Sequence, residues 1–262
     1  MSYFKQIADL LQEVNLTGLY QGRTARQFHI TGRRSGFNST SVLQDVSEVL
    51  GTTTDSITDL AGTETLEVVS SSINDDGSPA GTGAQTIKVA YIDTNGALVE
   101  SGNITLNGTT AVALGFSAKA LLWFEVTAAG SGGVAAGNIV IRNATGPVNL
   151  IQITAGGNKS LACYFMVPTG YTAYIPDWGG NAIGTTQDIR LRATVGSYAR
   201  DLQSPYHFVS NIYLGSGGTG EESIGFLAFP AGTRIKTSTV SGASPAGNRA
   251  DSSFNVVIIA NS

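Results

Sequence analysis

Hydrophobic and polar residues follow two different spacings in this chain, one before residue 63 and one after it. In residues 3–14 the apolar side chains recur at helical spacing behind Ser2, which predicts a helix with that serine as its N-cap. A second apolar face at 41–50 predicts another short helix. The segment 1–62 has too few apolar residues to enclose a core of its own. We therefore expect it to be an extended, partly helical docking arm.

From Thr63 onward, β-branched and aromatic runs alternate with clusters of Gly, Asn and Ser, which is typical of a sandwich or barrel. The predicted strands are 64–72, 85–93, 98–107, 119–128, 137–143, 149–155, 160–167, 171–176, 187–195, 207–214, 223–229, 233–240 and 254–260. They exceed the eight strands of a single jelly roll. We expect an all-β, jelly-roll-like antiparallel β-sandwich over 63–262. It is either one elaborated sandwich, which we favour, or two sub-domains that divide near 198–206.

Alternation and turn residues add detail to this prediction. Within 85–93, apolar and more polar side chains alternate, so one face should be core and the other should meet solvent or a partner. The following Asp93-Thr-Asn-Gly96 carries the Asn-Gly pair of a type I′ hairpin turn, and it is too short for an EF-hand calcium loop. Val167-Pro-Thr-Gly170 and Phe229-Pro-Ala-Gly232 predict tight corners between strands.

The composition indicates a protein that packs against neighbours. Charged residues are only 13% of the chain, against a usual share of ~25%, and 33 of the 262 residues are Gly. Little charge is left to keep an isolated monomer soluble. A net charge of −4 argues against nucleic-acid binding by the whole chain. No continuous apolar run reaches the ~18 residues of a membrane span, and the N-terminus lacks a secretory pattern. We expect a soluble protein made in a host cytoplasm, with no membrane partner.

The residues that carry catalytic chemistry are sparse. His29 and His207 are the two histidines, and neither comes with a Gly-x-Ser-x-Gly nucleophile elbow. Cys163 is the single cysteine; it lies in an apolar run and should be buried. Three such residues far apart do not make a zinc site. A hydrolase needs only two carboxylates, but the spacing of the acidic residues selects no pair. We predict no catalytic residue, metal site or cofactor.

The basic arm is the first candidate binding segment. Apolar side chains alternate there with arginines, which is uncommon in a tail that is only solvated. A partner-binding arm and a mobile terminus both remain open. The residues assigned to the partner contact are Phe4, Leu10, Leu11, Arg23, Arg26, Phe28, Arg33, Arg34 and Phe37.

The second candidate is an aromatic platform for a sugar. Tyr171, Tyr174 and Trp178 lie within eight residues beside Asp177, and aromatic faces can stack on sugar rings. The alternative is that Trp178 caps one end of the sandwich, which we favour.

Several segments together resemble a family of known proteins. A strand is followed by the loop Ser70–Gly83, by a strand ending in Tyr-Ile-Asp93, and by Leu106-Asn-Gly-Thr-Thr110. The corner at Val167–Gly170 and Tyr171-Thr-Ala-Tyr-Ile175 come later. In this order they resemble β-sandwich virion structural proteins of tailed bacteriophages, over about residues 64–180. The resemblance implies a capsid decoration, cement or head-spike role, and it brings no catalytic residues with it.

The sequence therefore predicts a non-enzymatic virion protein that decorates or stabilises a phage capsid. Its partners would be the major capsid protein or other virion subunits, and nucleic acid is not expected among them. It would be a homo-oligomer on the capsid surface, and a trimer is expected by analogy with three-fold positions. The alternative is a receptor- or carbohydrate-binding module of a tail fibre or spike. A hydrolase with a carboxylate pair on the sandwich is the third hypothesis.

Overall fold

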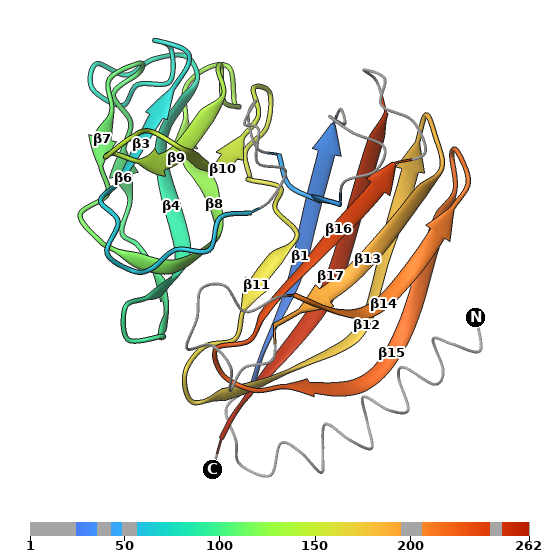
Figure 1. Cartoon of the computed structure of the whole chain (residues 1–262). Helices are drawn as coiled ribbons and strands as arrows, with labels where there is room; N and C mark the ends of the chain where they lie inside the picture. Colours follow the sequence, from blue (N-terminus) through green and yellow to red (C-terminus); the bar gives the residue numbers. More distant parts are fainter. Residues whose placement is uncertain (1–24, 36–42, 49–56, 195–205, 242–247, 262) are drawn as a thin grey trace.

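The computed structural model describes residues 25–35, 43–48, 57–194, 206–241 and 248–261. Every regular element in these ranges is a β-strand, and every strand pair is antiparallel. The strands form two groups, which we call the first lobe (β3–β10) and the second lobe (β1, β2 and β11–β17) (Figure 1). The all-β prediction is therefore confirmed.

The first lobe contains two small sheets. Its strands are β3 (Leu66–Ser70), β4 (Ala84–Asp93), β5 (Leu98–Glu100), β6 (Ile104–Thr105), β7 (Val112–Ala113), β8 (Ala118–Ala129), β9 (Ile139–Asn143) and β10 (Asn149–Ile153). One sheet has the order β10-β9-β3-β7, and in the other β4 pairs with β5, β6 and β8. The two sheets share one apolar cluster, to which Ile87, Phe124 and Ile141 belong.

The second lobe contains two sheets, one of four strands and one of five. Its strands are β1 (Ala25–Ser35), β2 (Gln44–Asp45), β11 (Tyr164–Met166), β12 (Tyr171–Ile183), β13 (Gln187–Ala193), β14 (His207–Leu214), β15 (Thr219–Phe229), β16 (Arg234–Ser241) and β17 (Arg249–Ala260). The sheet orders are β1-β17-β12-β15 and β11-β16-β13-β14, with the short β2 added on β16. A second apolar cluster takes side chains from both sheets, among them Phe254 and Ile189.

Strict alternation explains why these segments become strands with one buried face. In β17 the side chains at even positions, Ala250 to Ile258, are buried, and those at odd positions from Arg249 to Val257 are half-buried. In β13, Ile189 and Leu191 are fully buried and alternate with the half-buried charged residues Asp188, Arg190 and Arg192. A period of two places all apolar side chains on the face toward the opposite sheet.

The prediction of a partly helical arm is not supported. Residues 25–35 are β1, which pairs with β17 along its whole length, from Ala25 opposite Ile259 to Ser35 opposite Arg249. The predicted helix at 41–50 is wrong in its described part, because Gln44–Asp45 is β2 and pairs with β16. Both segments find strand partners far away in the sequence, and that tertiary pairing decides their conformation. The predicted helix at 3–14 lies outside the described residues.

The turn after β4 lies where the sequence predicts it but has another geometry. The N–H of Gly96 donates to the carbonyl oxygen of Asp93 at 3.0 Å, and Gly96 has φ of +86°. No described residue other than glycine has a positive φ, whereas a type I′ turn needs one at Asn95 as well. The predicted turn type is therefore wrong. Asp93 Oδ1 accepts the N–H groups of Asn95 at 2.9 Å and Ala97 at 2.8 Å, so its side chain holds the loop and Gly96 takes the left-handed position of a G1 bulge.

The two Pro-x-Gly corners are confirmed, and they contact each other. Gly170 and Gly232 have φ values of +81° and +82°, which suit the third position of a type II turn. The N–H of Val167 donates to the carbonyl oxygen of Thr233, and the N–H of Gly232 donates to that of Val167, both at 2.9 Å. The corners thus lie side by side at one end of the second lobe.

The two lobes share an apolar contact. The first-lobe side chains that belong to the apolar cluster of the second lobe are Ala90, Ile92, Ala120 and Leu122, on β4 and β8. The ring of Phe28 on β1 packs between the two lobes, with its centroid 5.7 Å from those of Trp123 and Phe165. The sequence predicts that one face of β4 meets solvent or a partner. Where the two lobes touch, the second lobe of the same chain covers that face.

Candidate functional site

The outward face of the sheet β1-β17-β12-β15 carries rows of polar side chains that run across the strands. One row is Arg33, Asp251, Asn181 and Thr219; the next is Thr31, Ser253, Gly179 and Glu221; a third is His29, Asn255, Asp177 and Ser223. The rows follow from the pairing register, because residues directly opposite one another on neighbouring strands point to the same face. We call this surface the outer polar face.

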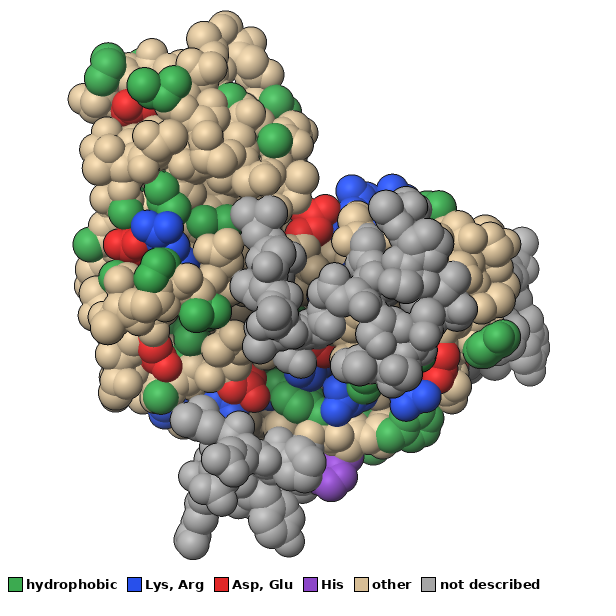
Figure 2. Space-filling model, turned by 45° about the horizontal axis from the view of Figure 1, so that its top comes forward, with side chains coloured by type: hydrophobic (Ala, Val, Ile, Leu, Met, Phe, Trp, Pro, Cys, Tyr) green, Lys and Arg blue, Asp and Glu red, His purple; other side chains and the backbone are tan. Residues whose placement is uncertain are grey.

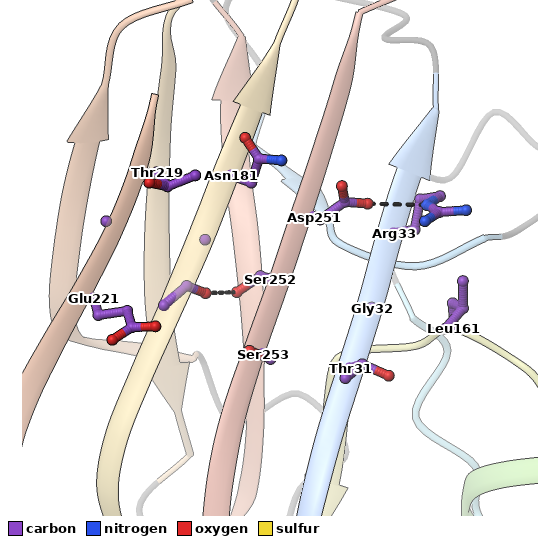
Figure 3. Close-up of a pocket in the computed structure, with 13 residues that line it drawn as sticks. Thr31, Gly32, Arg33, Leu161, Asn181, Thr219, Glu221, Asp251, Ser252 and Ser253 are labelled. Carbon is purple, nitrogen blue, oxygen red and sulfur yellow. Dashed lines mark hydrogen bonds and ion pairs between the residues drawn. The ribbon is translucent and has the colours of Figure 1, made fainter. Parts of the chain in front are cut away.

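A shallow trough of about 590 Å³ lies on the outer polar face (Figure 3). Its floor is low because Gly179 has no side chain and its neighbours across the strands, Thr31 and Ser253, are small. A Cβ on Gly179 would lie 2.8 Å from the carbonyl oxygen of Gly220, so the close approach of β12 and β15 excludes any larger residue. The trough is therefore built into the packing of the sheet.

One side of the trough is formed by an ion pair and an amide. Arg33 Nε lies 2.9 Å from Asp251 Oδ1, and Asn181 and Thr219 continue this row on β12 and β15 (Figure 3). Glu221 is exposed at the end of the floor. The lining thus combines an arginine paired with an aspartate, one free carboxylate and several groups that both donate and accept hydrogen bonds.

Beyond the trough, His29 belongs to a chain of hydrogen bonds. Its Nδ1 lies 2.9 Å from Asn255 Oδ1, and Asn255 Nδ2 donates to Asp177 Oδ1 at 2.7 Å. A nucleophile would need to lie within hydrogen-bond reach of the ring to form a triad, and no such contact is present among the described residues. The second histidine, His207, is exposed at the start of β14.

The predicted aromatic platform is not assembled. Trp178 is only 1% exposed and is part of the core, whereas Tyr174 points outward from the same strand. A bulge between Tyr174 and Trp178 inserts residues into β12, so positions that a regular strand would place on one face lie on opposite faces. Tyr171 also packs against the core. Trp178 therefore offers no face to a sugar.

The residues assigned to the basic arm separate into two groups. Arg26, Phe28, Arg33 and Arg34 lie on β1. Phe28 packs inside the chain, Arg26 lies 5.2 Å above the Phe28 ring, and Arg33 pairs with Asp251. These contacts hold β1 within the chain, and that of Phe28 with Trp123 also reaches the first lobe. Outside the described residues lie Phe4, Leu10, Leu11, Arg23 and Phe37.

Cys163 is a buried thiol, as predicted. It is fully buried in the second-lobe core, and this burial raises its pKa to about 12, so the thiol stays protonated at neutral pH. In the part of the chain that the structure describes, no three His, Cys, Asp or Glu residues lie close enough together to hold a metal ion. The described residues include no helix that is long and apolar enough to cross a membrane.

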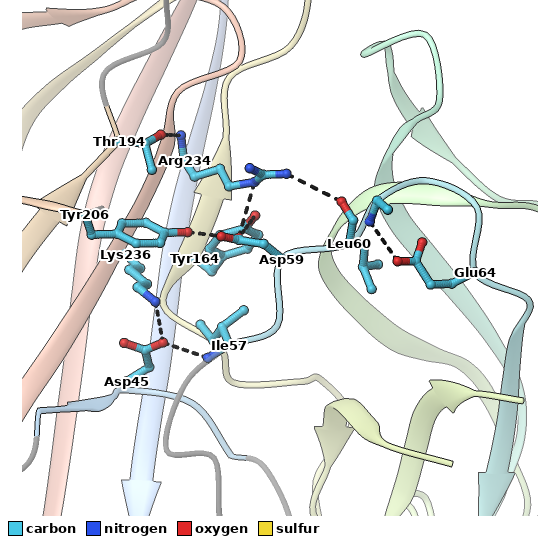
Figure 4. Close-up of polar contacts among 11 residues, drawn as sticks. Asp45, Ile57, Asp59, Leu60, Glu64, Tyr164, Thr194, Tyr206, Arg234 and Lys236 are labelled. Carbon is cyan, nitrogen blue, oxygen red and sulfur yellow. Dashed lines mark hydrogen bonds and ion pairs between the residues drawn. The ribbon is translucent and has the colours of Figure 1, made fainter. Parts of the chain in front are cut away.

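Two buried ion pairs fix the segment that leads from the second lobe into the first (Figure 4). Lys236 Nζ lies 2.7 Å from Asp45 Oδ2 and 3.9 Å from the centre of the Tyr206 ring. Arg234 Nε lies 3.2 Å from Asp59 Oδ1, which also accepts the Tyr206 hydroxyl at 3.0 Å. Burial, followed by the electrostatic effects of Tyr164 and Asp59, raises the pKa of Tyr206. Because each charge is partnered, this cluster is a structural clamp.

The sequence reasoning missed the outer polar face. Its residues are small or polar and lie on four distant segments, and only the pairing register brings them together. The one local signal is the run from Asp251 to Ser253 within a strongly alternating strand.

Comparisons with known proteins assign no family. No family model and no curated protein matches the sequence. Among solved structures, a chain of infectious bursal disease virus strain Gx is 12% identical, with a TM-score of 0.26 and coverage of 91% of this chain and 72% of that chain. For the VP2 subviral particle of the same virus the values are 10%, 0.20, 97% and 78%. TM-scores this low do not establish a shared fold, so these likenesses assign neither fold nor function.

Proposed function

We propose that this chain is a non-enzymatic structural protein of a virion. The observation that supports the proposal best is the strand order of the second lobe. Its strands β1 and β11–β17 form two four-stranded sheets, and the chain passes between the sheets in the sequence of an eight-stranded jelly roll. Viral capsid domains use this architecture, and so do lectin domains. Since a fold alone does not fix a function, the surface has to support the choice.

The surface offers a place for a neighbouring subunit. Three large apolar side chains are exposed on the edge strands β14 and β15: Phe208 is 61% exposed, Tyr213 71% and Leu227 46%. Exposed aromatic residues of this kind mark contacts between proteins, and unpaired edge strands need covering. Little charge opposes association, since charged residues make up only 13% of the chain and few charged side chains appear on the face in Figure 2.

The finer proposals follow from the resemblance to phage virion proteins. The chain would decorate or stabilise the capsid surface of a tailed bacteriophage, bind the major capsid protein or another virion subunit, and form a homotrimer. The strand topology supports a division into two domains other than the one expected near 198–206, because β13 and β14, which flank that segment, pair in one sheet. The second lobe would be the jelly roll, and the first lobe an insertion between β2 and β11. Residues 1–24, which precede β1, would contribute to docking.

The first test is to locate the protein in purified particles. Immunogold labelling and quantitative mass spectrometry should find it on the capsid in the copy number of a structural subunit. Confinement to the tail would favour a fibre or spike module, and absence from the particles would contradict the proposal.

The second test is the mass of the purified chain in solution. We expect three times 27.1 kDa by light scattering, and a shift toward the monomer in a Phe208→Ser, Tyr213→Ser double variant. Ile73→Ser is the matched control, because Ile73 is 74% exposed but lies in the first lobe. Equal effects of both changes would mean that β14 is not the contact.

A further inference from the structure

We infer that the trough on the outer polar face binds a neutral oligosaccharide. This inference is independent of the virion role, because it rests on the unsatisfied polar groups of the trough and on its shape. The site is distinct from the aromatic platform expected from the sequence, whose Trp178 is buried.

The first argument is the supply of free hydrogen-bonding groups. Five side chains of the trough make no side-chain hydrogen bond to any other described residue: Thr31, Asn181, Thr219, Glu221 and Ser253. Three are hydroxyls and one is an amide, and each of these both donates and accepts. Such groups match sugar hydroxyls, which also donate and accept.

The second argument is charge. Asp251 is shared by Arg33, at 2.9 Å, and Arg249, at 3.0 Å, so these three residues carry a net positive charge, which the unpaired Glu221 of the lining offsets. With no net excess of positive charge and no unpaired cation in its lining, the trough does not favour an anionic ligand such as a phosphate or a sulfated sugar. A neutral ligand can accept the Asn181 amide protons and donate to Glu221.

The third argument is shape. The floor runs across four strands, from Thr31 through Ser253 and Gly179 to Glu221, a span of about 14 Å at the usual strand spacing. A volume of about 590 Å³ lies within the range of small-molecule sites. Leu161 is the one large apolar residue of the lining, so an apolar ligand would gain little there. An elongated hydroxyl-rich molecule fits this outline.

The test is binding of the full-length chain to a panel of neutral and acidic oligosaccharides, measured by ligand-observed NMR and calorimetry. We expect binding to at least one neutral member and none to its sulfated counterpart. Asn181→Ala should weaken that binding about tenfold, because the loss of hydrogen bonds to one amide is of that order. Ser253→Phe should abolish it by filling the floor.

The control variant is Asn211→Ala. Asn211 is an exposed asparagine on β14, in the opposite sheet, and its replacement should leave the affinity unchanged. Circular dichroism and thermal unfolding establish that each variant is folded. The inference is overturned if no neutral member binds, if only acidic members bind, or if Ser253→Phe binds as tightly as the wild type while folded. A peptide found in the trough instead would overturn it as well.

Discussion

At the scale of single residues, Asp75 shows how one side chain can order several loops. Its carboxylate is fully buried in the first lobe and accepts the N–H groups of Ala84, Ala136 and Gly137 at 2.8 Å each. It also accepts the Ser70 hydroxyl at 2.6 Å. These donors come from distant parts of the chain, so the carboxylate replaces the pairing that irregular backbone lacks.

We therefore expect Asp75→Asn to lower the free energy of unfolding by about 3 kcal/mol, because the new amide nitrogen would face an N–H donor. Denaturant unfolding of the full chain measures the change. Asp76→Asn is the control, because Asp76 is partly exposed and accepts a single N–H, from Ser78. This substitution should lower the free energy of unfolding by well under 1 kcal/mol. Equal losses in both variants would mean that Asp75 has no special role.

At the scale of the elements, the sequence is informative where a strand carries its own pattern. Each of the thirteen predicted strands overlaps an observed one, because alternating apolar residues and turn residues are local signals. The strand β1 was missed because Phe28 and Ile30 are its only large apolar side chains. It becomes a strand because β17 offers an edge of matching length.

The turn between β4 and β5, in the first lobe, contacts the corner after β11, in the second lobe. The N–H of Thr169, in the corner after β11, donates to the carbonyl oxygen of Gly96 at 2.8 Å. A Cβ on Gly96 would lie 2.1 Å from Thr169 Oγ1. The left-handed backbone and the crowded corner both require glycine there.

Gly96→Ala should consequently destabilise the chain by more than its backbone strain alone. Gly115→Ala provides that baseline, because Gly115 also has a positive φ, +73°, but nothing lies within 4 Å of its Cβ position. We expect a loss of about 1 kcal/mol for Gly115→Ala and at least about twice as much for Gly96→Ala. The comparison is between the urea unfolding midpoints of the two variants. Equal midpoints would show that the corner adjusts to the added methyl group at little cost.

At the scale of the whole molecule, the candidate site was out of reach of sequence reasoning for a physical reason. Arg33, Asn181 and Asp251 lie in three segments that share no local pattern, and the register of β1, β17 and β12 alone places them in one row. The bulge in β12 removed Trp178 from the surface by the same kind of non-local effect. Composition, in contrast, belongs to the whole chain, and it correctly indicates a surface with little charge.

The shared apolar contact between the lobes decides whether they unfold together. An interface of this kind couples two lobes when it is large and hydrophobic. Ala120 is 2% exposed and lies in this contact on β8, so we expect one cooperative thermal transition for the full chain. Ala120→Arg would bury an unpaired charge, at a cost of about 3–5 kcal/mol, and should split the transition in two.

Calorimetry distinguishes this coupling from a general loss of stability. Ala128→Arg introduces the same residue on the same strand at an exposed position, and it should leave a single transition near the wild-type temperature. If Ala120→Arg also unfolds in one step, at a lower temperature, the lobes are coupled by more than this contact. The clamp around Asp45 and Asp59 would then be the remaining candidate, because it holds the segment that enters the first lobe. Two transitions in the wild type would contradict the coupling altogether.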